Sequence, residues 1–247
     1  AKRLGFVRRL RSAARGVAKF KSTRLWLGGC VPAAMFGAVA YGVGPSTISS
    51  VRAAAVVALC GRPTQQCPTA SIAVTTGSDT DPAVTLRCDL LFHWISMLYE
   101  DWMIPHRARC ARAWKLILGR MRALSPDKRW MRVAGPCAAT IVTLLELGWD
   151  PIEPGTWRNR NGETWEFDPQ AKPTKARCAP FLQEVRMDIL LDLWKKSARH
   201  RGGHGLQIDE DGLPDVETIR KQVAKYARSG LSGHATMLVK AAAGGLW

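Results

Sequence analysis

The residue types that most often perform catalysis are few in this sequence and lie far apart. The one dense acidic cluster is Asp209-Glu210-Asp211, followed by Gly212 in a polar segment. Carboxylates fixed on a turn could hold two metal ions for phosphoryl transfer, but this setting predicts a solvated turn. His93 lies in an apolar segment, and His106 has no recognisable partner. Phosphate-loop and serine-elbow motifs are absent. The sequence therefore predicts no catalytic residue and no cofactor.

The thiol and imidazole groups do not show metal-ligand spacing. The seven cysteines contain no Cys-x-x-Cys pair, and the closest two are Cys60 and Cys67. His200 and His204 have a helical spacing, but Gly202 and Gly203 between them oppose a helix. We expect no metal site. Because the cysteine number is odd, we interpret the thiols as small buried residues in a reducing compartment.

Charge is the strongest compositional signal. The 247 residues include 36 Lys and Arg against 20 Asp and Glu, which gives a net charge of +16. Apolar residues make up 47%, enough for a core of one large or two small domains. This composition excludes a disordered polar tail and a collagen-like chain, and it favours a polyanionic partner.

The first basic cluster occupies residues 1–24, which contain nine basic residues and no acidic one. Apolar residues at spacings of three and four predict a helix over 3–20 with one apolar face. Phosphates of nucleic acid, or an acidic membrane surface, would attract such a helix. Its candidate nucleic-acid-binding residues are Lys2, Arg3, Arg8, Arg9, Arg11, Arg15 and Lys19.

The second basic cluster spans residues 107–132, with Trp102, Trp114 and Trp130 in or beside it. Its candidate binding residues are Arg107, Arg109, Arg112, Lys115, Arg120 and Arg122, together with Trp114. Lys and Arg neutralise phosphates, and Trp can stack on a base. The alternative is that each Trp is a core residue and the arginines form the solvated face of the same helix.

An uncharged run follows the first cluster, from Leu25 to Val51. A basic flank before an apolar run is typical of a signal anchor, so 25–43 is a candidate membrane span. Gly44-Pro45 should end the helix that we expect over 24–43. The many small residues are equally typical of a closely packed core helix.

The remaining pattern predicts a mainly α fold with one β-hairpin. Further helices are expected over 46–60, 81–102, 105–123, 125–148, 179–200, 214–228 and 231–243, with a loop over 61–80. Asp81 is expected to cap the helix that Pro82 opens. The corresponding regions are 1–60 (thumb-like), 61–80 (loop), 81–150 (helical), 151–178 (hairpin and linker) and 179–247 (helical).

The hairpin is predicted over 156–167, where Asn161-Gly162 suits a two-residue type I′ turn. That turn would place Arg160 opposite Glu163 and Arg158 opposite Trp165.

The order of several motifs resembles a family. The string Cys30-Val31-Pro32-Ala33-Ala34-Met35-Phe36-Gly37-Ala38-Val39-Ala40-Tyr41-Gly42-Val43 is similar to the element that follows the palm in non-LTR retrotransposon reverse transcriptases. Phe36 stands where that element usually has Tyr. Asp81-Pro82, Gly135-Pro136, Leu147-Gly148-Trp149, Pro154-Gly155-Thr156-Trp157 and Ala243-Gly244-Gly245-Leu246-Trp247 resemble later elements of such polyproteins.

This resemblance implies a thumb and connection region that holds template RNA and primer DNA without performing the chemistry. The paired catalytic aspartates would precede Ala1, and a Cys/His knuckle and ribonuclease H region would follow Trp247. The location would be intracellular, with the nucleus as one site. Two other hypotheses remain: a single-span membrane-anchored protein with a basic cytoplasmic N-terminus, and a plain helical interaction domain.

Overall fold

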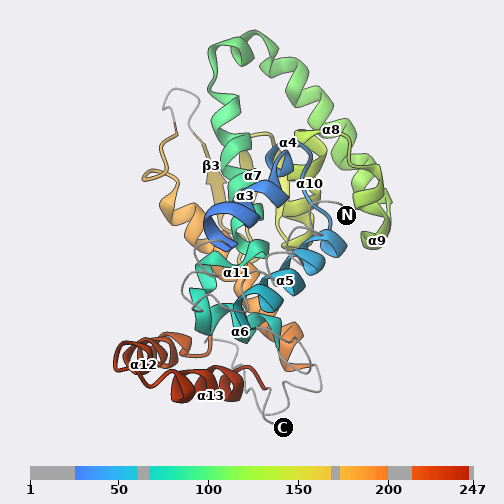
Figure 1. Ribbon diagram of the computed structural model, residues 1–247. Coiled ribbons are helices and arrows are strands. Elements are labelled where there is room, and N and C mark those ends of the chain that lie inside the picture. Colours follow the sequence, from blue (N-terminus) through green and yellow to red (C-terminus); the bar gives the residue numbers. More distant parts are fainter. Residues whose placement is uncertain (1–25, 61–66, 168–172, 200–212, 245–247) are drawn as a thin grey trace. The chain divides into compact units, whose positions relative to one another are not determined.

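The computed structural model describes residues 26–60, 67–167, 173–199 and 213–244 (Figure 1). These residues are mainly α-helical with one small antiparallel sheet, which confirms the expected fold class. The helices are η2 (Trp26–Cys30), α3 (Val31–Met35), α4 (Ala38–Tyr41), α5 (Pro45–Cys60), α6 (Pro68–Thr76), η3 (Ser78–Thr80), α7 (Pro82–Leu98), η4 (Asp101–His106), α8 (Arg107–Ala123), α9 (Pro126–Arg129), η5 (Trp130–Arg132), α10 (Pro136–Glu146), α11 (Ala179–Ala198), α12 (Val216–Arg228) and α13 (Ser232–Ala242). The strands are β1 (Asp150–Glu153), β2 (Thr156–Arg158) and β3 (Thr164–Glu166).

The chain divides into two compact units, and the divisions fall at residues 36/37 and 44/45, within α7 and within α11. Among the described residues, unit 1 comprises 26–36, 45–60, 67–85, 189–199 and 213–244. Unit 2 comprises 37–44, 86–167 and 173–188.

The core of unit 1 forms where α5 packs against α6 and η2. Trp26 of η2 is 2% exposed and packs with Val56 of α5 and Ile72 of α6, each 1% exposed. Helices α12 and α13 contact each other and α6. The Cys67 N–H donates to the carbonyl of Ala243 at 2.8 Å, which joins the start of α6 to the end of α13.

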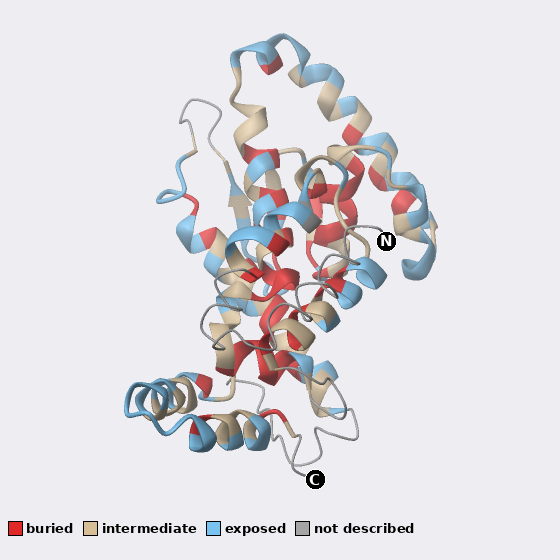
Figure 2. Cartoon of the chain, viewed as in Figure 1, coloured by how far each residue is buried: buried red, intermediate tan, exposed pale blue. Residues whose placement is uncertain are grey.

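The core of unit 2 contains a cluster of aromatic rings around Phe181 of α11. The ring centroids of Trp149, Trp157, Trp165 and Phe167 lie 5.8, 5.4, 5.7 and 5.2 Å from the Phe181 centroid. Tilted and edge-to-face pairs at these distances are favourable beyond the area they bury. The cluster fixes the sheet against α11, and Figure 2 shows buried residues concentrated in the neighbouring helices α7 and α10.

Several expected helices are confirmed. Helices α5, α8, α11, α12 and α13 lie close to the segments predicted for them. The expected cap is confirmed as well, since Oδ1 of Asp81 accepts a hydrogen bond from the Ala83 N–H at 2.8 Å.

The single helix expected over 24–43 is wrong. The chain turns at Gly37, whose φ is +83°, and α4 ends at Gly42, whose φ is +67°. Left-handed backbone interrupts a right-handed helix. The segment therefore forms only short helices: η2 and α3 before Gly37, and α4 between Gly37 and Gly42. Among all described residues, no helix has the length and apolarity needed to cross a membrane. Residues 26–43, the described part of the candidate span over 25–43, form short helices instead of one long helix.

Two other expectations need correction. The loop expected over 61–80 contains α6, which starts at Pro68, and residues 61–66 lie outside the described residues. Its hydroxyl-rich sequence is compatible with a helix because Thr75 and Thr76 donate to carbonyls of the preceding turn. The helix expected over 125–148 is divided at Gly135, whose φ is +94°.

The hairpin is confirmed, but its expected register is wrong. Arg158 pairs with Thr164, and Trp157 pairs with Trp165. The reason is Asn159: its Oδ1 accepts from the N–H groups of Asn161 and Glu163 at 2.9 and 2.8 Å, which forms a three-residue loop rather than a two-residue one. A further strand, β1, pairs with β2 and extends the hairpin to a three-stranded sheet.

Candidate nucleic-acid interface

Helix α8 separates its residues onto two faces. Trp114, Leu118 and Met121 are 0%, 7% and 5% exposed and follow one side of the helix at spacings of four and three. Arg109, Arg112, Lys115 and Arg120 are exposed. With Leu116, which is 65% exposed, these four residues form the outer face of α8.

The cations of this outer face have no acidic partner within the part of the chain that the structure describes. Among the described residues, Arg109, Arg112, Lys115 and Arg120 have no hydrogen bond or ion pair with another side chain. Helix α8 itself contains no Asp or Glu. Each guanidinium or ammonium therefore keeps its hydrogen-bond donors available to an external acceptor.

Two further candidate residues of α8 are engaged elsewhere in unit 2. Arg107 is half-buried and donates from Nη2 to the carbonyl of Leu98 at 3.3 Å. Arg122 forms an exposed ion pair with Asp150. These contacts connect α8 to the end of α7 and to β1, so they position the helix.

The spacing of the outer face suits an extended polyanion. Arg109, Arg112, Leu116 and Arg120 are separated by three, four and four residues, which places them in one row along the helix. At a rise of 1.5 Å per residue, the row is about 16 Å long. Phosphates of a nucleic-acid strand follow one another at about 3.4 Å along the B-DNA axis, so the row can reach several of them.

Side-chain contacts attach α8 to the rest of unit 2. The Trp114 indole N–H donates to the carbonyl of Pro151 at 2.9 Å, and its ring centroid lies 5.4 Å from that of Trp94. At the other end, Nε of Arg129 donates to the carbonyl of Met121 at 2.9 Å. The helix is thus held at its middle and its C-terminus, and the outer face needs no rearrangement to present its charges.

The structure corrects the expectation for Trp114. This residue is completely buried, so its ring supports the helix and is not available to stack on a base. Trp130 is half-buried, and its indole N–H donates to Glu146 at 2.6 Å. Trp102, the third tryptophan of the cluster, is 59% exposed in η4. The sequence does not predict this exposure. Its pattern extends the expected helix from residue 81 to Trp102, whereas α7 ends at Leu98.

The first basic cluster, including the candidates Lys2, Arg3, Arg8, Arg9, Arg11, Arg15 and Lys19, lies outside the described residues. The acidic triplet 209–211 and the histidine pair at 200 and 204 lie outside them too. No group of three or more potential metal ligands occurs within the part of the chain that the structure describes.

No cysteine within the described residues forms a disulfide. Cys30, Cys88 and Cys178 are buried. Burial, together with a smaller contribution from the neighbouring Cys110, raises the pKa of the Cys137 thiol to about 12. Burial also raises the pKa values of Cys30, Cys110 and Cys178. Since the thiolate is the reactive form, these environments oppose nucleophilic chemistry.

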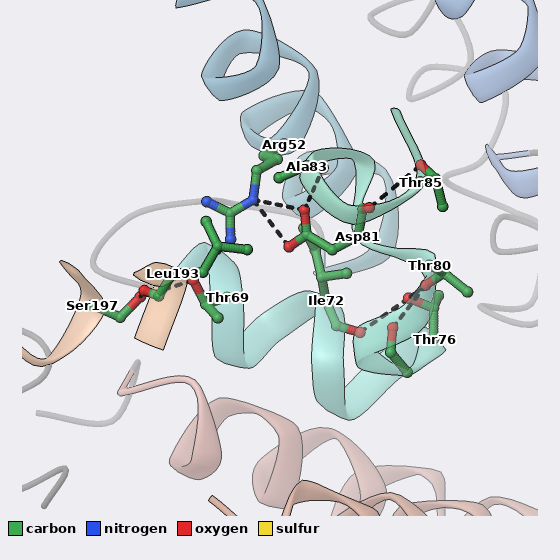
Figure 3. Close-up of polar contacts among 11 residues, drawn as sticks. Arg52, Thr69, Ile72, Thr76, Thr80, Asp81, Ala83, Thr85, Leu193 and Ser197 are labelled. Carbon is green, nitrogen blue, oxygen red and sulfur yellow. Dashed lines mark hydrogen bonds and ion pairs between the residues drawn. The ribbon is translucent and has the colours of Figure 1, made fainter. Parts of the chain in front are cut away.

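Unit 1 contains a second charged constellation, which is internal (Figure 3). Nε of Arg52 lies 2.9 and 3.0 Å from the two carboxylate oxygens of Asp81, and Nη2 donates to Oγ1 of Thr69 at 2.8 Å. Ser197 donates to the same Thr69 oxygen at 2.8 Å. The side chains of Arg52 and Asp81 are 13% and 3% exposed, so this network links α5, α6, α7 and α11 and offers no open charge.

Comparison with known proteins gives no matching family model, no matching curated protein and no matching solved structure. The geometry of α8 therefore provides the main evidence on function.

Proposed function

We propose that this chain is a non-catalytic nucleic-acid-binding protein that contacts phosphates through the outer face of α8. One observation carries the proposal: four exposed cations lie on a helix without acidic residues, and none is paired within the described residues. Exposed arginines on a stable protein are commonly balanced by acidic neighbours. A face that lacks them favours a polyanionic ligand.

The side chains of the outer face indicate how the ligand would be held. Arginine forms bidentate hydrogen bonds with phosphate, and its charge persists at any physiological pH. Phosphate contacts position a protein on nucleic acid but carry no direct sequence information. The proposed binding is therefore strongly salt-dependent and weakly sequence-dependent.

The resemblance to the post-palm region of non-LTR retrotransposon reverse transcriptases extends this proposal. In that setting the chain would hold template RNA and primer DNA beside a catalytic palm, in an intracellular location such as the nucleus. The residues Lys2 to Lys19 of the first cluster would supply further phosphate contacts. The order of motifs from Cys30 to Gly244 supports this extension.

A pair of charge-matched variants tests the role of α8. In the outer-face variant, Arg109, Arg112 and Arg120 are changed to Gln, which has a helix propensity close to that of Arg. In the control variant, Lys221, Lys225 and Arg228 of α12, also exposed, are changed to Gln. Both variants lose three positive charges, so they differ only in where the charge is lost.

Affinity for a fluorescently labelled RNA–DNA heteroduplex is measured by anisotropy at low salt. The proposal expects the outer-face variant to bind about 10- to 100-fold more weakly than the wild type, while the control variant changes little. Equal loss in both variants would show that net charge, rather than α8, attracts the ligand. Undetectable binding by the wild type at low salt would contradict the proposal as a whole.

A further inference from the structure

The segment that leads into α8 contains an exposed aromatic residue. Trp102 is 59% exposed, whereas the other tryptophans within the described residues are buried or half-buried. Ile104, two residues later, is 52% exposed. Keeping an indole in water gives up a large hydrophobic contribution to folding, so an exposed tryptophan in the segment that leads directly into α8 is informative.

Trp102 is held on a structured support. It lies in η4, which joins α7 to α8 within unit 2 (Figure 1). Met103, the next residue, is 7% exposed, and its N–H donates to the carbonyl of Glu100 at 2.8 Å. The buried Met103 anchors η4 inward, so the residues on either side of it, Trp102 and Ile104, face solvent.

The charges around η4 divide the ligand into two parts. Glu100 and Asp101 immediately precede Trp102 and would repel a phosphate placed on η4 itself. The cations of the outer face of α8 begin seven residues beyond Trp102, at Arg109. We therefore expect an uncharged group of a polyanionic ligand to contact η4 and the phosphates of the same ligand to contact α8.

We propose that Trp102 stacks on an unpaired nucleobase while the outer face of α8 contacts the adjoining phosphates. Bases inside a duplex are already stacked on one another, whereas those of a single strand expose their faces. The ligand of this site is accordingly single-stranded nucleic acid, or a strand next to a duplex end. This inference rests on the proposed function of α8 and adds the form of nucleic acid that it selects.

The test compares oligodeoxythymidylate with relaxed closed-circular duplex DNA, which has no strand ends. Base–aromatic stacking predicts that Trp102→Ala lowers affinity for the single strand about 5- to 150-fold and leaves affinity for the circular duplex unchanged. Trp102→Phe keeps an aromatic face and should retain much of the single-strand affinity, whereas Trp102→Leu should not. Met131→Ala removes another exposed apolar side chain of unit 2, 81% exposed, and is the matched control.

The outcomes separate this inference from the proposed function. If Trp102→Ala leaves single-strand affinity unchanged, or weakens both ligands equally, the stacking contact is wrong while salt-dependent binding by α8 stands. If Trp102→Leu retains single-strand affinity, the contact does not need an aromatic ring, and the inference is overturned. A change in oligomeric state of Trp102→Ala, seen by sedimentation, would assign the residue to a protein–protein contact instead. Absence of salt-dependent binding in the wild type would remove the proposed function and this inference together.

Discussion

Arg52 of unit 1 and the outer-face arginines of unit 2 have opposite roles. In unit 1, Arg52 of α5 is largely buried, and its Nε and Nη2 donate to Asp81 and Thr69. In unit 2, Arg109, Arg112 and Arg120 extend from α8 without partners among the described residues. The same side chain therefore maintains structure where burial requires a counter-charge, and keeps its donors exposed where the described residues provide none.

This comparison first predicts a large difference in stability. Arg52→Met leaves the Asp81 carboxylate buried without its counter-charge, so we expect a loss of about 3–5 kcal/mol in the free energy of unfolding. Arg112→Met, on the exposed face, should change it by less than about 0.5 kcal/mol. Urea denaturation followed by circular dichroism measures both. Similar effects for the two variants would contradict the division between internal and external arginines.

The second prediction is that hydrogen-bonded polar groups inside unit 2 stabilise the fold, as the contacts of Arg52 do in unit 1. Glu184 of α11 accepts hydrogen bonds from the Trp165 indole N–H at 2.6 Å and from the Asn159 side chain. Glu184→Leu removes the acceptor of the Trp165 indole and one of two acceptors of the Asn159 amide, which also donates to Glu163 at 2.8 Å. This loss should cost about 1–3 kcal/mol of unfolding free energy.

Gln183→Ala, one residue away and exposed, is the control for Glu184→Leu. Thermal unfolding of the two variants provides the comparison. An unaltered melting temperature in Glu184→Leu would mean that the hairpin does not depend on the hydrogen bonds to Glu184.

The smallest expected effect has the opposite sign. Thr140 of α10 is completely buried, and its hydroxyl has no hydrogen-bond partner within the described residues. Thr140→Val removes this unsatisfied group and should raise the unfolding free energy by about 1 kcal/mol. Thr75→Val is the matched control because the Thr75 hydroxyl does donate, to the carbonyl of Ser71 at 2.6 Å.

Calorimetry of the two threonine variants should show a higher transition temperature for Thr140→Val and no rise for Thr75→Val. A rise of the same size in both would indicate a general benefit of valine rather than relief of a buried hydroxyl.

The sequence predicts the longer helices because their periodicity and their start signals agree. Helix α8, for example, is recognisable from the spacing of Trp114, Leu118 and Met121, and α7 from Asp81-Pro82. It does not predict the interruption at Gly37, because small apolar residues on both sides continue the same pattern. Strand β1 escaped prediction because Asp150-Pro151 disfavours a strand, which pairing with β2 nevertheless stabilises.

The candidate site could be predicted only in part. The cluster of cations on α8 is visible in the sequence, but which of them the protein itself neutralises depends on tertiary contacts such as that of Arg122 with Asp150. The roles of the tryptophans depend on the exact end of α7. Because that helix ends at Leu98, Trp102 is exposed in η4 while Trp114 is buried beneath α8.

The salt dependence of nucleic-acid binding tests the central claim most directly. Each phosphate neutralised contributes about 0.7 to 0.9 to the slope of log affinity against log salt concentration. The account predicts that changing Arg109, Arg112 and Arg120 to Gln makes the wild-type slope shallower by about 2 to 3, and that the charge-matched α12 variant retains it. A wild-type affinity that does not fall with salt, or equal slopes in all three proteins, would contradict the assignment of the outer face of α8 as a phosphate-binding surface.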